Sequence, residues 1–149
     1  MKNLILNSVI FFGFIFSIQI SADLKPLSKI IEEHEGQNEF LTSFSSKRCA
    51  AIYLEVGRIM QTDNPGLMKL LVDSASELTL LAALMDSRKD LSNITPSDVA
   101  SADADVKRIL KIVKSISNDH YAKTGVYLEA HMDDMKTCRI LYPPDQKIF

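Results

Sequence analysis

One stretch near the end of the chain combines three residue types that bind soft metals. His131, Met135 and Cys138 are spaced i, i+4 and i+7, which places them on one face of a helix. Imidazole, thioether and thiolate groups together suit a soft ion such as Cu(I). In the alternative interpretation, Met135 fills the core, Cys138 forms a disulfide and His131 lies at the edge of the buried stripe. We favour this alternative, and we therefore assign no metal ligand and no cofactor.

A haem site is a second chemical possibility. His120 lies one helical step beyond Ile116, so it could face the interior of a bundle, and Met60 or Met68 would lie near the same end. His and Met are common axial ligands of haem iron. A histidine at a helix junction, however, is more often solvated or hydrogen-bonded to protein. A soft-metal-binding or haem-binding bundle is thus the alternative function.

Motifs that would indicate catalysis are incomplete in this sequence. Residues 103–114 begin like a calcium loop but lack the glycine at the sixth place and the glutamate at the twelfth. The pair His34-Glu35 is not followed by the second histidine of a zinc protease motif, and no Gly-x-Ser-x-Gly is present. We assign no catalytic residue and favour a non-enzymatic protein.

The two cysteines, Cys49 and Cys138, are the best candidates for a covalent cross-link. They lie in the first and the last strong helical segment, which can be antiparallel neighbours in a bundle. A bridge would close a loop of about ninety residues, worth about 4–5 kcal/mol on the chain-entropy model. Two free thiols are the alternative. No Cys-x-x-Cys motif supports redox catalysis or haem attachment.

The start of the chain predicts export. Lys2 precedes an apolar run over residues 4–18, and Ala22 provides a small residue at the expected cut, as in a cleavable signal peptide. An uncleaved membrane anchor is the alternative, although the run is at the short end for a membrane span. Residues 1–22 are therefore the predicted signal peptide, and the protein is expected in the periplasm or outside the cell.

Beyond the leader, apolar periodicity predicts only helices. An N-terminal helical arm is expected over residues 23–37, with Gly36 as the stop of its short helix. Strong helices are expected over residues 39–61 and 65–89. Asn64 suits the cap of the second of these helices, and Pro65 suits its first turn.

Thr95, Pro96 and Asp98 resemble a capping box at the start of a third helix. A turn is predicted at Asn118-Asp119, because an unbroken helix to residue 141 would exceed forty residues. A fourth helix would then run over residues 119–142. The expected fold is all-α: an up-down four-helix bundle over residues 38–142, with a short N-terminal helical arm, a signal peptide that is removed, and a C-terminal tail over residues 143–149.

Charge and composition exclude some partner classes. The chain has 17 Lys and Arg against 19 Asp and Glu, and it has no Trp. Nucleic-acid affinity depends on cationic side chains that neutralise phosphates, and anionic membranes attract clusters of basic residues. Neither partner is expected after removal of the leader.

The helix over residues 65–89 has apolar side chains on more than one face. Val72, Leu80 and Leu84 could form a surface for self-association or for a protein partner, unless other helices or the arm cover them. The sequence therefore predicts a small exported helical-bundle protein that functions by binding. It does not identify the ligand or the partner.

Overall fold

The described part of the protein, residues 24–149 of a computed structural model, contains only helices as regular elements. The elements are α1 (Leu27–Glu33), α2 (Asn38–Met60), α3 (Pro65–Ser87), α4 (Pro96–Thr124), a 3₁₀ turn η1 (Leu128–His131) and α5 (Met132–Leu141). The predicted all-α class is confirmed. The predicted signal peptide lies outside the described residues.

Two helices begin at the caps that the sequence predicts. The Asn64 side chain accepts a hydrogen bond from the Leu67 N–H at 3.0 Å, and Pro65 opens α3. At α4, the Asp98 N–H donates to Thr95 Oγ1 while the Thr95 N–H donates to Asp98 Oδ2. These reciprocal bonds satisfy two N–H groups that the helix leaves unpaired.

The predicted turn at Asn118-Asp119 is wrong. Helix α4 continues through these residues and ends at Gly125, whose φ of 76° is the left-handed conformation favoured by glycine. Both residues are exposed, and neither Asn nor Asp costs a helix more than about 0.7 kcal/mol. The fourth predicted helix is consequently divided between the end of α4, η1 and the short α5.

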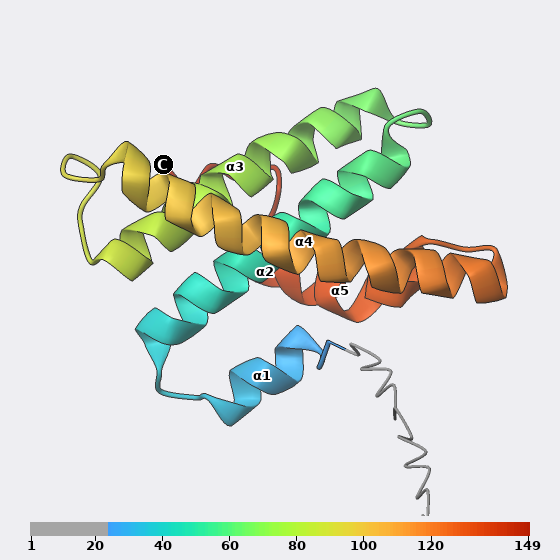
Figure 1. Cartoon of the computed structure of the whole chain (residues 1–149), viewed down its shortest axis with the longest axis horizontal. Helices are drawn as coiled ribbons and strands as arrows, with labels where there is room; N and C mark the ends of the chain where they lie inside the picture. The colour runs from blue at the N-terminus through green and yellow to red at the C-terminus, as the bar shows by residue number, and fades with distance from the viewer. Residues whose placement is uncertain (1–23) are drawn as a thin grey trace, which may run out of the picture.

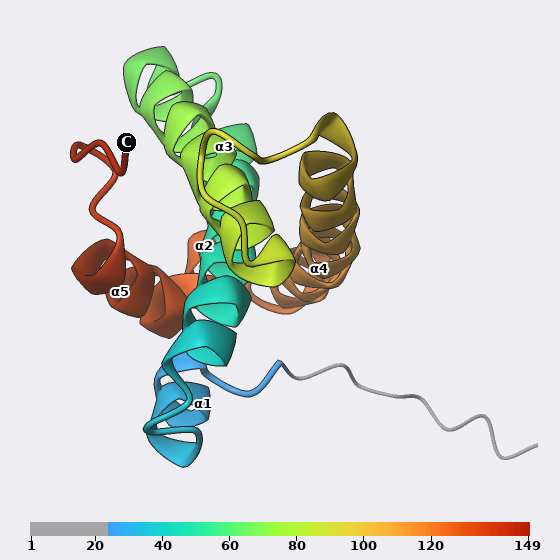
Figure 2. The same cartoon turned by 90° about the vertical axis from the view of Figure 1, so that its left-hand side faces the viewer.

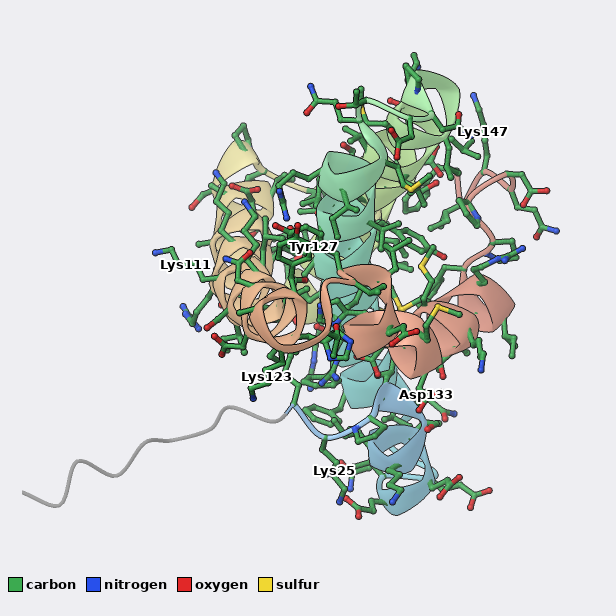
Figure 3. The ribbon with its side chains drawn as sticks, turned by 90° about the vertical axis from the view of Figure 1, so that its right-hand side faces the viewer. Lys25, Lys111, Lys123, Tyr127, Asp133 and Lys147 are labelled. Atoms are coloured by element: carbon green, nitrogen blue, oxygen red, sulfur yellow. A yellow bond between two sulfur atoms is a disulfide. The ribbon has the colours of Figure 1, made fainter. Side chains whose placement is uncertain are left out.

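The arrangement also differs from a simple up-down bundle. Helices α2 and α3 form an antiparallel hairpin, as expected, but α4 crosses this hairpin (Figure 1). Viewed from the side, α2 lies between α4 and α5 (Figure 2). Lys111 and Lys123 project from the outer side of α4 (Figure 3).

Helix α2 is the central helix of the fold. It contacts α1, α3, α4 and α5, and it is buried on several faces. Small residues make this possible, because Ser46, Ala50 and Ala51 are fully buried and leave room for neighbouring helices. Phe40, near the start of this helix, has the apolar spacing of a core residue but is 47% exposed.

Both ends of the described chain are docked on the helices. In the arm, α1 packs against α5 and α2, and Leu27 is fully buried. In the tail, Ser74 Oγ donates to the Pro144 carbonyl at 2.9 Å, and the Ile148 N–H donates to Glu77 Oε2 at 2.8 Å. Among the described helices, none is long and apolar enough to cross a membrane.

Candidate functional site

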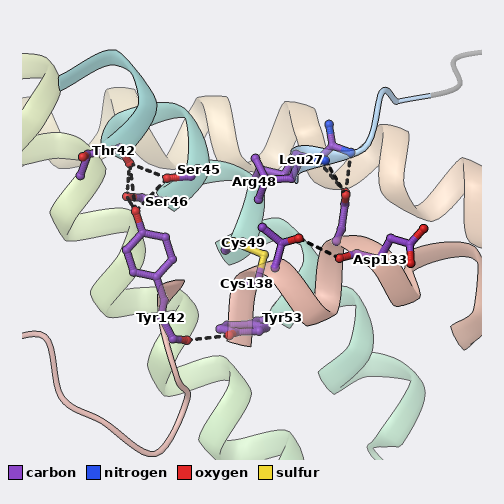
Figure 4. Close-up of a disulfide and its surroundings, with 12 residues drawn as sticks. Leu27, Thr42, Ser45, Ser46, Arg48, Cys49, Tyr53, Asp133, Cys138 and Tyr142 are labelled. Carbon is purple, nitrogen blue, oxygen red and sulfur yellow. Dashed lines mark hydrogen bonds and ion pairs between the residues drawn. A yellow bond between two sulfur atoms is a disulfide. The ribbon is translucent and has the colours of Figure 1, made fainter. Parts of the chain in front are cut away.

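A disulfide joins Cys49 of α2 to Cys138 of α5, with the two Cα atoms 5.4 Å apart (Figure 4). Both cysteines are fully buried, and no free cysteine remains among residues 24–149. The bridge therefore ties the central helix to the last one, as the sequence predicts. We call the contact surface between α2 and α5 the seam.

A buried ion pair lies next to the disulfide in the seam. Arg48 donates to Asp134 Oδ2 from Nε at 2.8 Å and from Nη2 at 2.5 Å, and the two side chains are 3% and 8% exposed. The Leu27 N–H donates to the other carboxylate oxygen at 2.8 Å, which fixes the start of α1. Such charge-assisted bonds are stronger than neutral ones.

This ion pair was not predicted from the sequence, although the sequence contains a signal for it. Arg48 precedes Cys49, and Asp134 lies one helical turn before Cys138. Once the two cysteines are bridged, the helical repeat brings the oppositely charged side chains near each other.

The other end of the seam is closed by two tyrosines. The Tyr53 hydroxyl donates to the Tyr142 carbonyl at 2.6 Å, and the Tyr142 hydroxyl lies 2.8 Å from Ser45 Oγ (Figure 4). Burial raises the pKa of Tyr53 to about 12. Tyr53 therefore stays protonated and keeps its donor role at any physiological pH.

His131 is buried at the start of α5 and lies 2.8 Å, through Nε2, from Ser117 Oγ of α4. Loss of solvation lowers the pKa of His131, against the opposing effects of the Val113 backbone and of the Asp134 charge. A serine beside a histidine resembles the nucleophile and base of a hydrolase. Ser117, however, is fully buried, and the Asp134 carboxylate is occupied by Arg48, so this arrangement offers a substrate no access.

The three side chains of the candidate soft-metal site are not free to bind an ion. Cys138 is in the disulfide, His131 is hydrogen-bonded to Ser117, and Met135 packs against the core. Within residues 24–149, no three His, Cys, Asp or Glu side chains are grouped to hold a metal ion.

The candidate haem ligand, His120, lies in the last turns of α4. Its Nε2 is 3.5 Å from Glu129 Oε2 of η1. Tyr121 is exposed and stacks on Tyr127 with ring centroids 4.1 Å apart. The Arg58 guanidinium in turn lies over the Tyr127 ring, 5.8 Å from its centroid. Aromatic stacking and the Arg58 contact therefore hold this end of α4, whereas the buried His120 Nε2 has no hydrogen-bond partner among the described residues.

An open groove of about 690 Å³ lies between the start of α2 and the end of α3. Its apolar wall consists of Phe40, Phe44 and Met85, and the two phenylalanine rings stack with centroids 5.8 Å apart. Arg88 and Glu39 lie at its rim, with Arg88 Nη2 3.8 Å from Glu39 Oε2. We call this hollow the groove.

The floor of the groove is a network of paired polar groups. Ser43 Oγ donates to Asp86 Oδ1 at 2.5 Å, and Lys47 Nζ lies 2.5 Å from Asp86 and 2.9 Å from Asp105. Burial acts to lower the pKa of Lys47, but its bonds to Asp105 and Asp86 outweigh burial, and the net pKa is raised. Lys47 is therefore a fixed positive charge that is already neutralised.

The apolar surface expected on α3 is partly used within the chain. Leu84 is buried, while Val72 and Leu80 are half-buried. Near the C-terminal end of α3, Met85 borders the groove together with Arg88, the residue that caps this helix.

The fold and the disulfide define the class of protein: a small all-α protein in which a disulfide joins the central helix, α2, to the last helix, α5. Comparison of the chain with models of protein families, with curated proteins and with solved structures gives no match.

Proposed function

We propose that the protein is exported, loses residues 1–22 as a signal peptide, and functions outside the cytosol as a non-enzymatic binding protein. The sequence of the leader motivates export. The buried disulfide supports it, because such bonds form and persist in oxidising compartments such as the periplasm or the extracellular space.

The groove is the proposed binding site, and its occupant is a segment of a partner protein. A half-exposed aromatic pair beside Met85 offers a place for one apolar side chain. At the rim, Arg88 has a side chain that is 83% exposed and is held only by a long contact to Glu39. The partner segment should therefore carry an apolar residue followed closely by an acidic one.

The backbone of Arg88 is the observation that carries this assignment. Arg88 has φ 52°, and it is the one non-glycine residue with a positive φ in the described chain. Glycine is favoured at such a helix end, since a side chain there costs free energy. An arginine at this unfavourable position on the groove rim is consistent with a guanidinium group that binds a ligand.

Binding is favoured over catalysis because the polar groups of the groove floor are mutually paired. Ser43 and Lys47 are both bound to Asp86, and Lys47 is also bound to Asp105. A nucleophile or a general base needs a lone pair or a proton site that is open to substrate. These groups instead give the groove a rigid floor.

Selection from a library of displayed random peptides tests the proposal, with the disulfide-bonded exported protein as bait. Peptides with an apolar residue next to an acidic one should be enriched and should lose at least tenfold in affinity with Phe40→Ala. Ile140→Ala is the matched control, because Ile140 is 80% exposed but lies on α5, outside the groove. Enrichment of peptides that bind Phe40→Ala as tightly as the parent, or of none at all, would refute the groove as the site.

A further inference from the structure

The connection between α3 and α4 carries two adjacent basic residues in an exposed position. Arg88 and Lys89 follow Ser87, the last residue of α3, and residues 88–95 reach the start of α4 at Pro96. This connection lies at the edge of the molecule (Figure 1). The Arg88 side chain is 83% exposed, and Leu91, three residues further along, is also exposed.

The two other basic pairs in the sequence lie inside helices. Lys47 and Arg48 belong to α2, where Arg48 is bound to Asp134 in the buried seam. Lys107 and Arg108 belong to the middle of α4. Endoproteases bind their substrates as extended chain, so a pair within a stable helix is protected unless the helix unfolds. Arg88-Lys89 differs, because only the last turn of α3 has to fray.

The disulfide joins the segment before the α3–α4 connection to the segment after it. Cys49 belongs to the segment that ends at Arg88, and Cys138 belongs to the segment that begins at Lys89. The Arg48–Asp134 pair and the packing of α2 against α4 also link the two segments. A cut between the two basic residues therefore leaves every one of these links in place.

We propose that the Arg88–Lys89 peptide bond is a processing site for an endoprotease specific for basic residues, and that the mature protein consists of two disulfide-linked chains. One water molecule is consumed as the C–N bond breaks. The Arg88 carbonyl carbon becomes a carboxylate, and the Lys89 nitrogen becomes an ammonium group. The first chain holds α1 to α3, and the second holds α4, η1 and α5.

The neighbouring bond, Lys89–Asp90, is the poorer substrate. The Asp90 carboxylate accepts hydrogen bonds from Ser92 Oγ at 2.8 Å and from the Asn93 side chain at 2.6 Å, which closes a tight turn. Lys89 Nζ also lies 2.6 Å from Asp98 Oδ2. The residues after Lys89 are thus held in a turn, whereas the exposed Arg88 side chain is available to a protease pocket for cations.

Cleavage at this position would also change the groove. Arg88 borders the groove and would become the free end of the first chain, with its new carboxylate close to its guanidinium. This consequence makes the processing site a means of altering the groove, but the processing proposal stands without the binding function.

Limited digestion of the disulfide-bonded protein with trypsin is the first test. The first product should be heavier than the parent by the mass of one water molecule, should stay in one piece without reductant, and should separate into two chains with it. Arg88→Gln combined with Lys89→Gln should slow this first cut at least tenfold. Lys107→Gln combined with Arg108→Gln, the matched change within α4, should leave the rate unchanged.

The cut protein should keep the helical circular dichroism of the parent. A first cut elsewhere, or loss of the helical signal with the cut, would overturn the proposal. Protein recovered after export should give a second N-terminal sequence that starts Lys-Asp-Leu-Ser, from Lys89 onwards. A single N-terminal sequence there would reject processing even if trypsin cuts the isolated protein at this bond.

Discussion

Lys47 and Arg48 are neighbours in sequence but belong to two different environments. Arg48 points into the seam, where it pairs with one carboxylate, Asp134, that is itself buried. Lys47 lies under the groove and contacts two carboxylates, Asp86 and Asp105, of which Asp86 is 42% exposed. One helix thus presents a desolvated ion pair on one side and a solvated network on the other.

The comparison separates what holds the fold together from what is open to a partner. In the seam, the disulfide, the ion pair and the Tyr53–Tyr142 hydrogen bond are buried. A polar group that loses its partner there cannot pair with water instead. Around the groove, water can replace a lost partner. Substitutions should therefore be costly at the seam and mild at the groove.

The largest effect should come from removing the disulfide. Cys49→Ala combined with Cys138→Ala should lower the free energy of unfolding by about 4–5 kcal/mol, because the unfolded chain regains the freedom of a long loop. Urea unfolding followed by circular dichroism measures this change. A loss below about 1 kcal/mol would mean that the seam is held without the covalent link.

Breaking one ion pair on each side of α2 tests the comparison directly. Asp134→Ala should cost about 3–5 kcal/mol, because it leaves a buried guanidinium and the Leu27 N–H without a partner. Asp86→Ala is the matched change at the groove and should cost less than about 1 kcal/mol, since its carboxylate is solvated and Lys47 retains Asp105. Equal losses would contradict the distinction between the two regions.

Acid should destabilise the folded protein through the buried His131. The pKa of His131 in the folded protein is lowered from its ordinary value of 6.5, mainly by burial. The unfolded chain therefore binds a proton first, and the free energy of unfolding should fall as the pH drops below about 6.5.

Urea denaturation between about pH 5 and 7 measures the effect of His131, because most carboxylates stay ionised in this range. His131→Gln keeps an amide to pair with Ser117 but does not titrate. The free energy of unfolding of this variant should therefore change less with pH over the same range. A parent protein with a profile as flat as that of the variant would show that His131 is not responsible.

The smallest effect should be a gain of stability at the groove. Arg88→Gly should raise the free energy of unfolding by about 0.5–1 kcal/mol, because glycine adopts the positive φ of this position without strain. Arg88→Ala removes the guanidinium but keeps the strain, so it should give no such gain. The thermal midpoints of the two variants distinguish relief of strain from loss of charge.

Parts of the fold could be predicted from short stretches of sequence. The caps at Asn64 and Thr95 are contacts over three residues, so residue order alone determines them. The pairing of Cys49 with Cys138 was expected from the first and last helices being neighbours, and the structure brings the two residues to the same height. The helix break could not be located in this way, because Asn118 and Asp119 weaken a helix only slightly while Gly125 tolerates the left-handed conformation that ends one.

Burial and pairing, in contrast, were decided by the tertiary structure. Phe40 and Tyr121 match the apolar pattern of their helices, yet both are exposed, because no neighbouring helix covers them. Which face of a helix is covered depends on elements far along the chain, and α4 crosses the α2–α3 hairpin rather than running beside it. The sequence by itself determined the all-α class and where two of the helices start, since those interactions are local. Only the packing of α2 between α4 and α5 decided that Arg48 is buried, that His131 binds Ser117, and that a groove remains open.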